Sequence, residues 1–314
     1  MKERQLVDLP ASVRQRLLNL SKARGEDFNL TLTRYGTERL LYRLSKSDYA
    51  GQFVLKGAML FSLWTGRLQR PTRDLDLLGY GASSQEALTR TFRDISQIDA
   101  TPDGLTFHPD SVKVTEIREG QRYRGQRVHL MATLGNARIH LQVDVGFGDV
   151  ITPPAREVDF PSMLGFPSAR LRAYSKETVI AEKLEAMAVL GIANSRMKDF
   201  YDVWMMSREF PFDGRMLARA IGATFRHHAV ELPRTSPTAF TEAFAQDPIK
   251  LRQWGAFLSR NRLDAGGLSF SQVVAEIRLF LMPVILAAAN GQELDADWPE
   301  AGPWVATQNN MGIP

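Results

Sequence analysis

A chain of 314 residues is long for one domain and short for three, so we expect two packed units. Apolar residues make up 44% and charged residues 24%, which excludes wholesale disorder, and the lack of cysteine excludes disulfide scaffolds, cysteine-ligated metals and thiol nucleophiles. The net charge is only +4, but the basic residues are 30 Arg and 9 Lys. This excess favours a phosphate-bearing partner, although a codon bias would produce the same ratio.

Residues 1–50 are predicted to form helices, because apolar residues recur at three- and four-residue spacing in 6–20 and again in 32–44. We interpret the charged residues of this segment as a solvated, mildly basic outer face. The N-terminus has no apolar targeting segment, and the longest apolar run, Leu279 to Ala289, is about half a membrane span and contains Pro283. These features predict a soluble, cytoplasmic protein with no membrane segment.

The block from 52 to about 150 has a mixed α/β pattern. A short apolar strand ends in Lys56-Gly57-Ala58 and precedes a helical run, and Asp74 to Leu78 is predicted to form a second strand ended by Gly79. A helix over 85–98 and strands over 112–114, 127–133 and 138–145 follow.

A turn-rich passage, 152–167, is predicted to separate this block from a helical half. Helices are expected over 175–190, 195–209, 214–226, 237–245, 248–260 and 269–289. The tail from Gln292 holds four acidic residues and no Lys or Arg, so we expect an extended or loosely ordered arm. The predicted divisions are a helical segment packing on the core (1–50), an α/β core (51–160), a helical domain (161–290) and an acidic tail (291–314).

Two carboxylates two residues apart are the first candidate site. On a strand, Asp74 and Asp76 point to one face about 6–7 Å apart, while the intervening leucine faces the core. Paired carboxylates repel each other unless a cation lies between them, and Mg²⁺ takes one or two carboxylates together with phosphate oxygens. The alternative is a solvent-facing strand end without a metal.

Asp144 is an acid within the apolar strand Leu141 to Val145. Burying such a group is costly without a partner, so it is either an ion-paired strand residue or a third carboxylate for a metal site. Three acids can hold two Mg²⁺ ions in a phosphoryl displacement.

Lysine is scarce in the chain, yet several lysines accompany the candidate features. Lys56 precedes the glycine turn, where Gly57 permits close approach of a phosphate to backbone N–H groups. Lys183 lies on the helix that Ser175 is expected to cap, and the next helix begins Arg196-x-Lys198-Asp199-x-x-Asp202. Here Arg196 can pair with Asp199 at i,i+3 and Lys198 with Asp202 at i,i+4, as on ordinary surface helices.

Taken together, the Gly57-Ala58 turn, the Asp74/Asp76 strand and the later Asp144 strand resemble the nucleotidyltransferase β superfamily. The segments around Lys176 to Lys183 and Arg196 to Asp202 resemble the AbiEii/AbiGii nucleotidyltransferase toxins, including the MenT-type tRNA-modifying members. The resemblance covers residues 10 to 290. It implies an α+β, nucleotidyltransferase-like mixed sheet with flanking helices, plus a C-terminal helical bundle domain.

The resemblance also implies roles for individual residues. Asp74, Asp76 and Asp144 would hold Mg²⁺ or Mn²⁺, and Asp144 would assist deprotonation of the attacking hydroxyl. Lys183 and Asp199 would complete the catalytic set. The implied nucleotide-binding residues are Lys56, Gly57, Ala58, Thr72, Arg73, Lys183, Arg196 and Lys198. Many superfamily members have Ser at position 58, so in this chain backbone N–H groups must serve in place of that hydroxyl.

The implied function is a toxin of a bacterial toxin–antitoxin or phage-defence pair. It would transfer a nucleoside monophosphate from an NTP to RNA, first of all to the tRNA 3′ end, and so block translation. The implied partners are the RNA acceptor, the NTP and a cognate antitoxin from an adjacent gene, and the protein is expected to be a monomer. Two alternatives stay open: an acceptor hydroxyl on a protein or small molecule, and a nucleotide- or RNA-binding regulator with an inactive site.

Overall fold

The computed structural model describes residues 8–66, 69–119 and 123–307. The chain divides into two compact units. The first unit contains the chain up to Gly148 together with Arg156–Ala173, and the second contains Asp149–Ala155 and the chain from Tyr174 onward. The first unit is a mixed α/β structure and the second is mainly helical, so the predicted α+β class is confirmed.

A seven-stranded mixed sheet forms the first unit, in the order β3-β4-β5-β2-β1-β7-β6. Strand β2 pairs parallel with β5 and β1 pairs parallel with β7, while the other neighbours are antiparallel. The strands are β1 (Phe53–Lys56), β2 (Asp74–Gly79), β3 (Leu105–Glu119), β4 (Tyr123–Leu134), β5 (Ala137–Phe147), β6 (Arg156–Phe160) and β7 (Ala169–Ala173).

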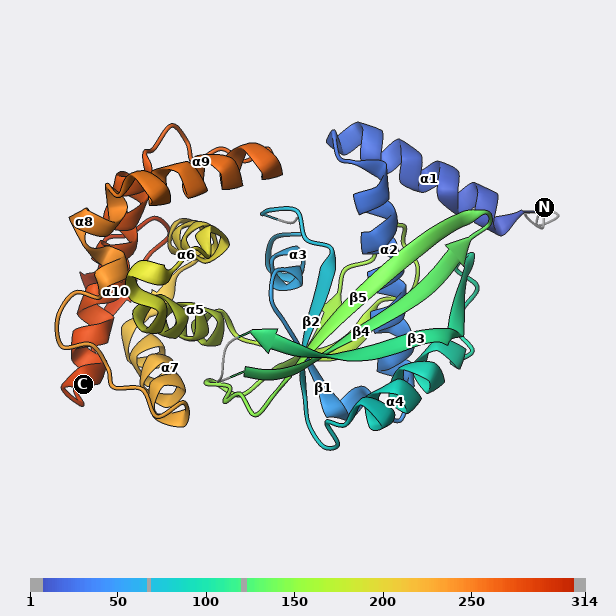
Figure 1. Cartoon of the computed structure of the whole chain (residues 1–314), viewed down its shortest axis with the longest axis horizontal. Helices are drawn as coiled ribbons and strands as arrows, with labels where there is room; N and C mark the ends of the chain where they lie inside the picture. Colours follow the sequence, from blue (N-terminus) through green and yellow to red (C-terminus); the bar gives the residue numbers. More distant parts are fainter. Residues whose placement is uncertain (1–7, 67–68, 120–122, 308–314) are drawn as a thin grey trace, which may run out of the picture. The chain divides into compact units, whose positions relative to one another are not determined.

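One face of this sheet is packed against helices and the other carries polar side chains. Along β5 the residues Leu141, Val143 and Val145 are buried, whereas the alternating Gln142 and Asp144 are half-buried. Helix α2 passes behind strands β3 to β5 in the view of Figure 1 and covers the apolar face. The helices of the unit are α1 (Leu9–Arg24), α2 (Phe28–Lys46), α3 (Met59–Thr65) and α4 (Gln85–Gln97).

The passage that we predicted to be a boundary contains one strand of the sheet and is followed directly by another. Strand β6 lies within 152–167, and β7 returns beside β1 with Leu55 opposite Ala173. The helical part therefore begins at Tyr174 rather than at 161. Strand β3 is also longer than the predicted 112–114, because a register shift between His108 and Lys113 interrupts its alternation.

Six α-helices occur among the described residues of the second unit. Helix α10 is long and apolar enough to cross a membrane by length and composition, and it is the only such helix in the described part of the chain. However, it buries Val273, Ile277 and Phe280 and packs against α6 and α7, as the core helix of a globular unit does. The helices are α5 (Lys176–Leu190), α6 (Met197–Glu209), α7 (Gly214–His227), α8 (Glu242–Ala245), α9 (Pro248–Asn261) and α10 (Phe270–Ala289).

The acidic tail is extended as far as Thr307 and forms two short strands, which fits the extended arm, and not the loosely ordered one, of our expectation. It contributes β9 (Ala296–Trp298) and β10 (Val305–Ala306) to a small sheet with β8 (Phe212–Asp213). The indole N–H of Trp298 donates to the carbonyl of Ser207 at 2.6 Å. Two of the acids, Glu293 and Asp295, form ion pairs with α7, for example Asp295 with Arg215 at 2.6 Å.

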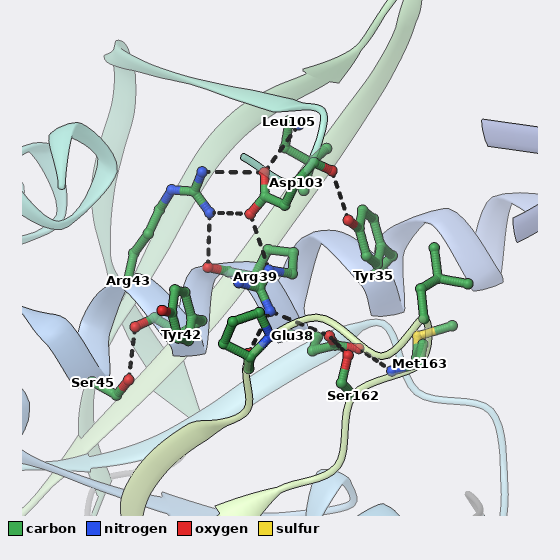
Figure 2. Close-up of polar contacts among 12 residues, drawn as sticks. Tyr35, Glu38, Arg39, Tyr42, Arg43, Ser45, Asp103, Leu105, Ser162 and Met163 are labelled. Carbon is green, nitrogen blue, oxygen red and sulfur yellow. Dashed lines mark hydrogen bonds and ion pairs between the residues drawn. The ribbon is translucent and has the colours of Figure 1, made fainter. Parts of the chain in front are cut away.

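A buried ion cluster ties α2 to two distant loops (Figure 2). The guanidinium of Arg39 donates to Asp103 at 3.0 Å, and that of Arg43 donates to the same carboxylate at 2.7 Å and 3.3 Å. All three side chains are at least nine-tenths buried. Glu38, also buried, accepts from the hydroxyl of Ser162 and the amide of Met163. Glu38, Arg39 and Arg43 therefore form part of the core, and our interpretation of the charges as a solvated face is wrong for α2. It holds for α1, whose basic residues Arg14, Arg16, Lys22 and Arg24 are exposed.

Candidate active site

Four charged residues stand side by side across the open face of the sheet. Lys56 on β1 is opposite Asp76 on β2, Asp76 is opposite Asp144 on β5, and Asp144 is opposite Arg127 on β4. Residues that pair in register lie on the same face, and neighbouring strands are about 4.8 Å apart. This cross-strand row (Lys56, Asp76, Asp144, Arg127) therefore places two carboxylates between two cations.

Asp74 adds a third carboxylate on the same face of β2. The burial of β2 alternates, with Asp74 and Asp76 half-buried and Leu75 and Leu77 buried, as the pattern of the sequence predicts. The register partner of Asp74 on β5 is Gln142. The structure thus gathers Asp74, Asp76 and Asp144 on neighbouring parallel strands.

Gly57 lies directly against Asp76. It has a φ of +73°, and an added Cβ would lie 2.6 Å from Asp76 Cγ and 2.7 Å from Asp76 Cβ. Only glycine combines this left-handed backbone with such a close approach. The glycine of the predicted turn is therefore required by the position of the carboxylate as well as by the backbone.

Replacing Gly57 with alanine is expected to lower the free energy of unfolding by about 1–3 kcal/mol, because the residue is strained at positive φ and displaces Asp76. Urea unfolding followed by circular dichroism measures the loss. The matched control is Gly51→Ala, since Gly51 has no heavy atom within 4 Å of an added Cβ and no positive φ. Equal stability of the two variants would contradict this account.

The other predicted residues of the first unit follow Gly57 or precede β2. Ala58 is the N-cap of α3 and makes no side-chain capping bond, and its side chain is buried. The hydroxyl of Thr72 lies 3.4 Å from the carbonyl of Asp74, and Arg73 is exposed. Of these three side chains, only that of Ala58 is buried.

Asp144 is held by Arg127 in a two-point ion pair. Arg127 Nε donates to Oδ1 at 2.8 Å and Nη2 donates to Oδ2 at 2.7 Å, and the side chains are 34% and 19% exposed. The amide of Gln142 also donates to Oδ1, at 3.3 Å. Both oxygens of the third acid thus have donors within the protein.

The donor set on this face fits a hard divalent cation in part. Asp74 and Asp76 supply carboxylate oxygens from one face of one strand, and Mg²⁺ in proteins takes one or two carboxylates. Within the described ranges, no three His, Asp or Glu side chains form a group ready to hold a metal. Because Asp144 is paired with Arg127, Asp74 and Asp76 are the carboxylates that suit a divalent cation here.

A second polar cluster lies between α5 and α6 in the second unit. Ser175 caps α5 as predicted, by accepting from the amide of Thr178 at 3.2 Å. Lys183 donates to Asp199 at 2.7 Å and to Asp202 at 2.8 Å, and Arg196 donates to Asp199 at 2.7 Å. The i,i+3 pair of Arg196 with Asp199 is confirmed. Asp202, however, pairs with Lys183 of the other helix.

The electrostatics of this cluster keep Asp199 ionised. Burial alone would raise the pKa of Asp199, but the positive charges of Lys183 and Arg196 outweigh burial and lower the pKa to about 2. The exposed Lys198 contributes to the same lowering of the pKa. Lys183 is therefore held by two carboxylates, and Asp199 stays charged at neutral pH.

Replacing Lys183 with methionine is expected to lower the free energy of unfolding of the second unit by about 2–3 kcal/mol, because it removes a charged hydrogen-bond donor from two buried carboxylates. The loss is limited because Asp199 keeps Arg196. Urea unfolding monitored through tryptophan fluorescence of this unit gives the measurement. Lys198→Met, at an exposed position of the neighbouring helix, should be nearly neutral. A neutral Lys183→Met would contradict the expectation.

Sequence reasoning did not find Arg127 and Gln142. Both lie on predicted strands, but neither belongs to a motif, and only the register of β4, β5 and β2 brings them to the acids. The alternation of polar residues on these strands was the available signal, because it places both on the face of Asp144.

Comparisons with known proteins identify the family of the chain. A sequence model of the family described as "Nucleotidyl transferase AbiEii toxin, Type IV TA system" matches residues 39–276. A comparison with curated protein sequences gives no significant match. A comparison with solved structures matches two proteins from Helicobacter pylori. JHP933 has 12% identity and a TM-score of 0.45, covering 82% of this chain and 93% of its own. A protein provisionally assigned as a nucleotidyltransferase has 15% identity and a TM-score of 0.43, covering 81% and 93%.

Proposed function

Because the chain belongs to the AbiEii nucleotidyltransferase toxin family of type IV toxin–antitoxin systems, we propose that it transfers a nucleoside monophosphate from an NTP to RNA. The preferred acceptor is the 3′ end of tRNA, and the consequence is a block of translation in the cytoplasm. As the toxin of such a system, the protein has a cognate antitoxin. The single observation that carries the proposal is the pair Asp76 and Asp144 in register beside Asp74.

In the proposed reaction, an acceptor hydroxyl attacks the α-phosphorus of the NTP. The new P–O bond forms as the bond to the β-phosphate oxygen breaks, pyrophosphate leaves, and Asp144 assists removal of the hydroxyl proton. Asp74 and Asp76, joined in the proposal by Asp144, would hold Mg²⁺ or Mn²⁺. When bound, such a cation would neutralise charge on the transferring phosphoryl group.

Basic residues and backbone N–H groups bind the triphosphate in this proposal. In the first unit, Gly57 and Ala58 are proposed to offer backbone N–H groups to the phosphates, since glycine permits a close approach to the backbone. In the same unit, the cationic side chains of Lys56 and Arg73 and the hydroxyl of Thr72 are assigned to the phosphates. From the second unit, Lys183 is assigned to the β- and γ-phosphates, Arg196 and Lys198 assist, and Asp199 orients Lys183.

The proposal is tested by incubating the purified protein with total RNA, Mg²⁺ and each of the four NTPs labelled at the α-phosphate. We expect label in RNA of tRNA size with at least one nucleotide. Label in protein or in a small molecule would keep the reaction and change the acceptor. No labelled product with any of the four nucleotides, in a whole lysate as well as in RNA, would overturn the proposed activity.

A further inference from the structure

Arg127 stands at one end of the cross-strand row and belongs to none of the motifs that point to nucleotidyl transfer. Its guanidinium meets Asp144 side-on, with both donors within 2.8 Å of the two carboxylate oxygens. This two-point geometry is the strongest form of an arginine–carboxylate contact. The pair is partly buried, so solvent screens it less than an ion pair on the surface.

The row as a whole is balanced in charge. Two carboxylates at Asp76 and Asp144 are matched by Lys56 and Arg127, and Asp74 brings one further negative charge to the face. Adjacent carboxylates on neighbouring strands repel each other unless cations lie close by. In the protein alone, Arg127 therefore neutralises the negative charge of Asp144, as a bound divalent cation would.

From this geometry we infer that Arg127 is a positioning residue that competes with the divalent cation for Asp144. The inference rests on the proposed function. Asp144 can become a metal ligand only when Arg127 releases at least one of its oxygens, so Arg127 weakens cation binding in the absence of nucleotide. A guanidinium released in this way has a new partner of suitable shape in the NTP, because arginine binds phosphate through the same two-point geometry.

The inference predicts opposite effects of Arg127→Gln with and without nucleotide. Without nucleotide, we expect the variant to bind Mn²⁺ about fivefold more tightly, because Asp144 no longer has a competing cation. With a non-hydrolysable NTP analogue, we expect about fivefold weaker binding of the nucleotide, because a phosphate contact is lost. Electron paramagnetic resonance of free Mn²⁺ measures the first affinity, and calorimetry measures the second.

Companion variants separate this role from a general loss of structure. Asp144→Asn should weaken Mn²⁺ binding, and in that background Arg127→Gln should have no further effect on Mn²⁺. Arg127→Lys keeps the charge without the two-point geometry and should give intermediate values even if Arg127→Gln folds poorly. Arg170→Gln on β7, which breaks the exposed pair with Glu157, is the matched control and should change neither affinity.

The outcomes distinguish this inference from the proposed function. Unchanged or weaker Mn²⁺ binding by Arg127→Gln and Arg127→Lys, with transfer to RNA intact in the wild type, overturns the inference alone. Failure of the wild type and both variants to bind Mn²⁺ overturns the metal role and the inference together. Tighter Mn²⁺ binding by the variants, in a protein that labels no acceptor, supports the competition at Asp144 and refutes the proposed transfer.

Discussion

Replacing Asp76 with asparagine is expected to reduce nucleotidyl transfer at least about a thousandfold, which corresponds to about 4 kcal/mol of transition-state stabilisation. Asp76 is one of the two inner residues of the cross-strand row, with Lys56 and Asp144 as its register partners on either side. Asparagine preserves the shape of the side chain beside Gly57 and removes its charge. The measurement is the rate at which α-labelled NTP is incorporated into RNA under single-turnover conditions.

The control for Asp76→Asn is Asp159→Asn. Asp159 is an exposed aspartate on β6 of the same sheet, and it lies outside the cross-strand row. This variant should keep wild-type activity, and both variants should have the circular dichroism spectrum of the wild type. Retention of more than a tenth of the wild-type rate by Asp76→Asn would exclude a central role for this carboxylate in the reaction.

Replacing Asp103 with asparagine is expected to lower the free energy of unfolding of the first unit by about 3–5 kcal/mol. The change leaves Arg39 and Arg43 as buried cations without the carboxylate that both now contact. The hydrogen bond from Tyr35 to the backbone carbonyl of this residue would remain. Urea unfolding, with hydrogen exchange of peptides from α2, measures the loss.

The same ion cluster predicts a dependence of stability on acid. Burial alone would raise the pKa of Asp103, but hydrogen bonds and charge from Arg43 and then Arg39 outweigh it and lower the pKa below its usual value. A carboxyl group with a lowered folded-state pKa stabilises the protein fully above its unfolded pKa of about 3.9, and this stabilisation is lost as the pH falls through the folded pKa. Asp103→Asn should therefore flatten the loss of stability of the wild type below about pH 4.

Asp99→Asn provides the comparison for both measurements, because Asp99 is exposed in the loop that leads to Asp103. It should leave the free energy of unfolding and its acid dependence unchanged. An equally small effect at Asp103 would mean that the buried arginines find other partners.

The part of the site that is local in sequence could be predicted. The alternation of leucine and aspartate in β2 fixes which residues face the core, and the glycine turn and Asp144 follow from similarly short patterns. The pairing of Arg196 with Asp199 was also predictable, because both lie within one helical turn.

The contacts between distant segments could not be predicted. Arg127 reaches Asp144 only because β4 and β5 pair in one particular register, and a shift by one residue would turn it to the other face. Arg39 and Arg43 look like the solvated face of a helix until Asp103, some sixty residues later, is packed against them. Strands β6 and β7 were missed because prolines and turns surround them, although the alternation of β7 is regular.

The path of the chain has a practical consequence for deletion experiments. The chain passes between the two units at 148–149, 155–156 and 173–174, so β7 reaches its place beside β1 only after a segment that belongs to the other unit. A truncated gene product that ends at residue 148 would leave β1 as a sheet edge with unpaired N–H and C=O groups, which favours aggregation. Loss of toxicity in such a product would report a damaged sheet, and it would not show that the helical half is needed for chemistry.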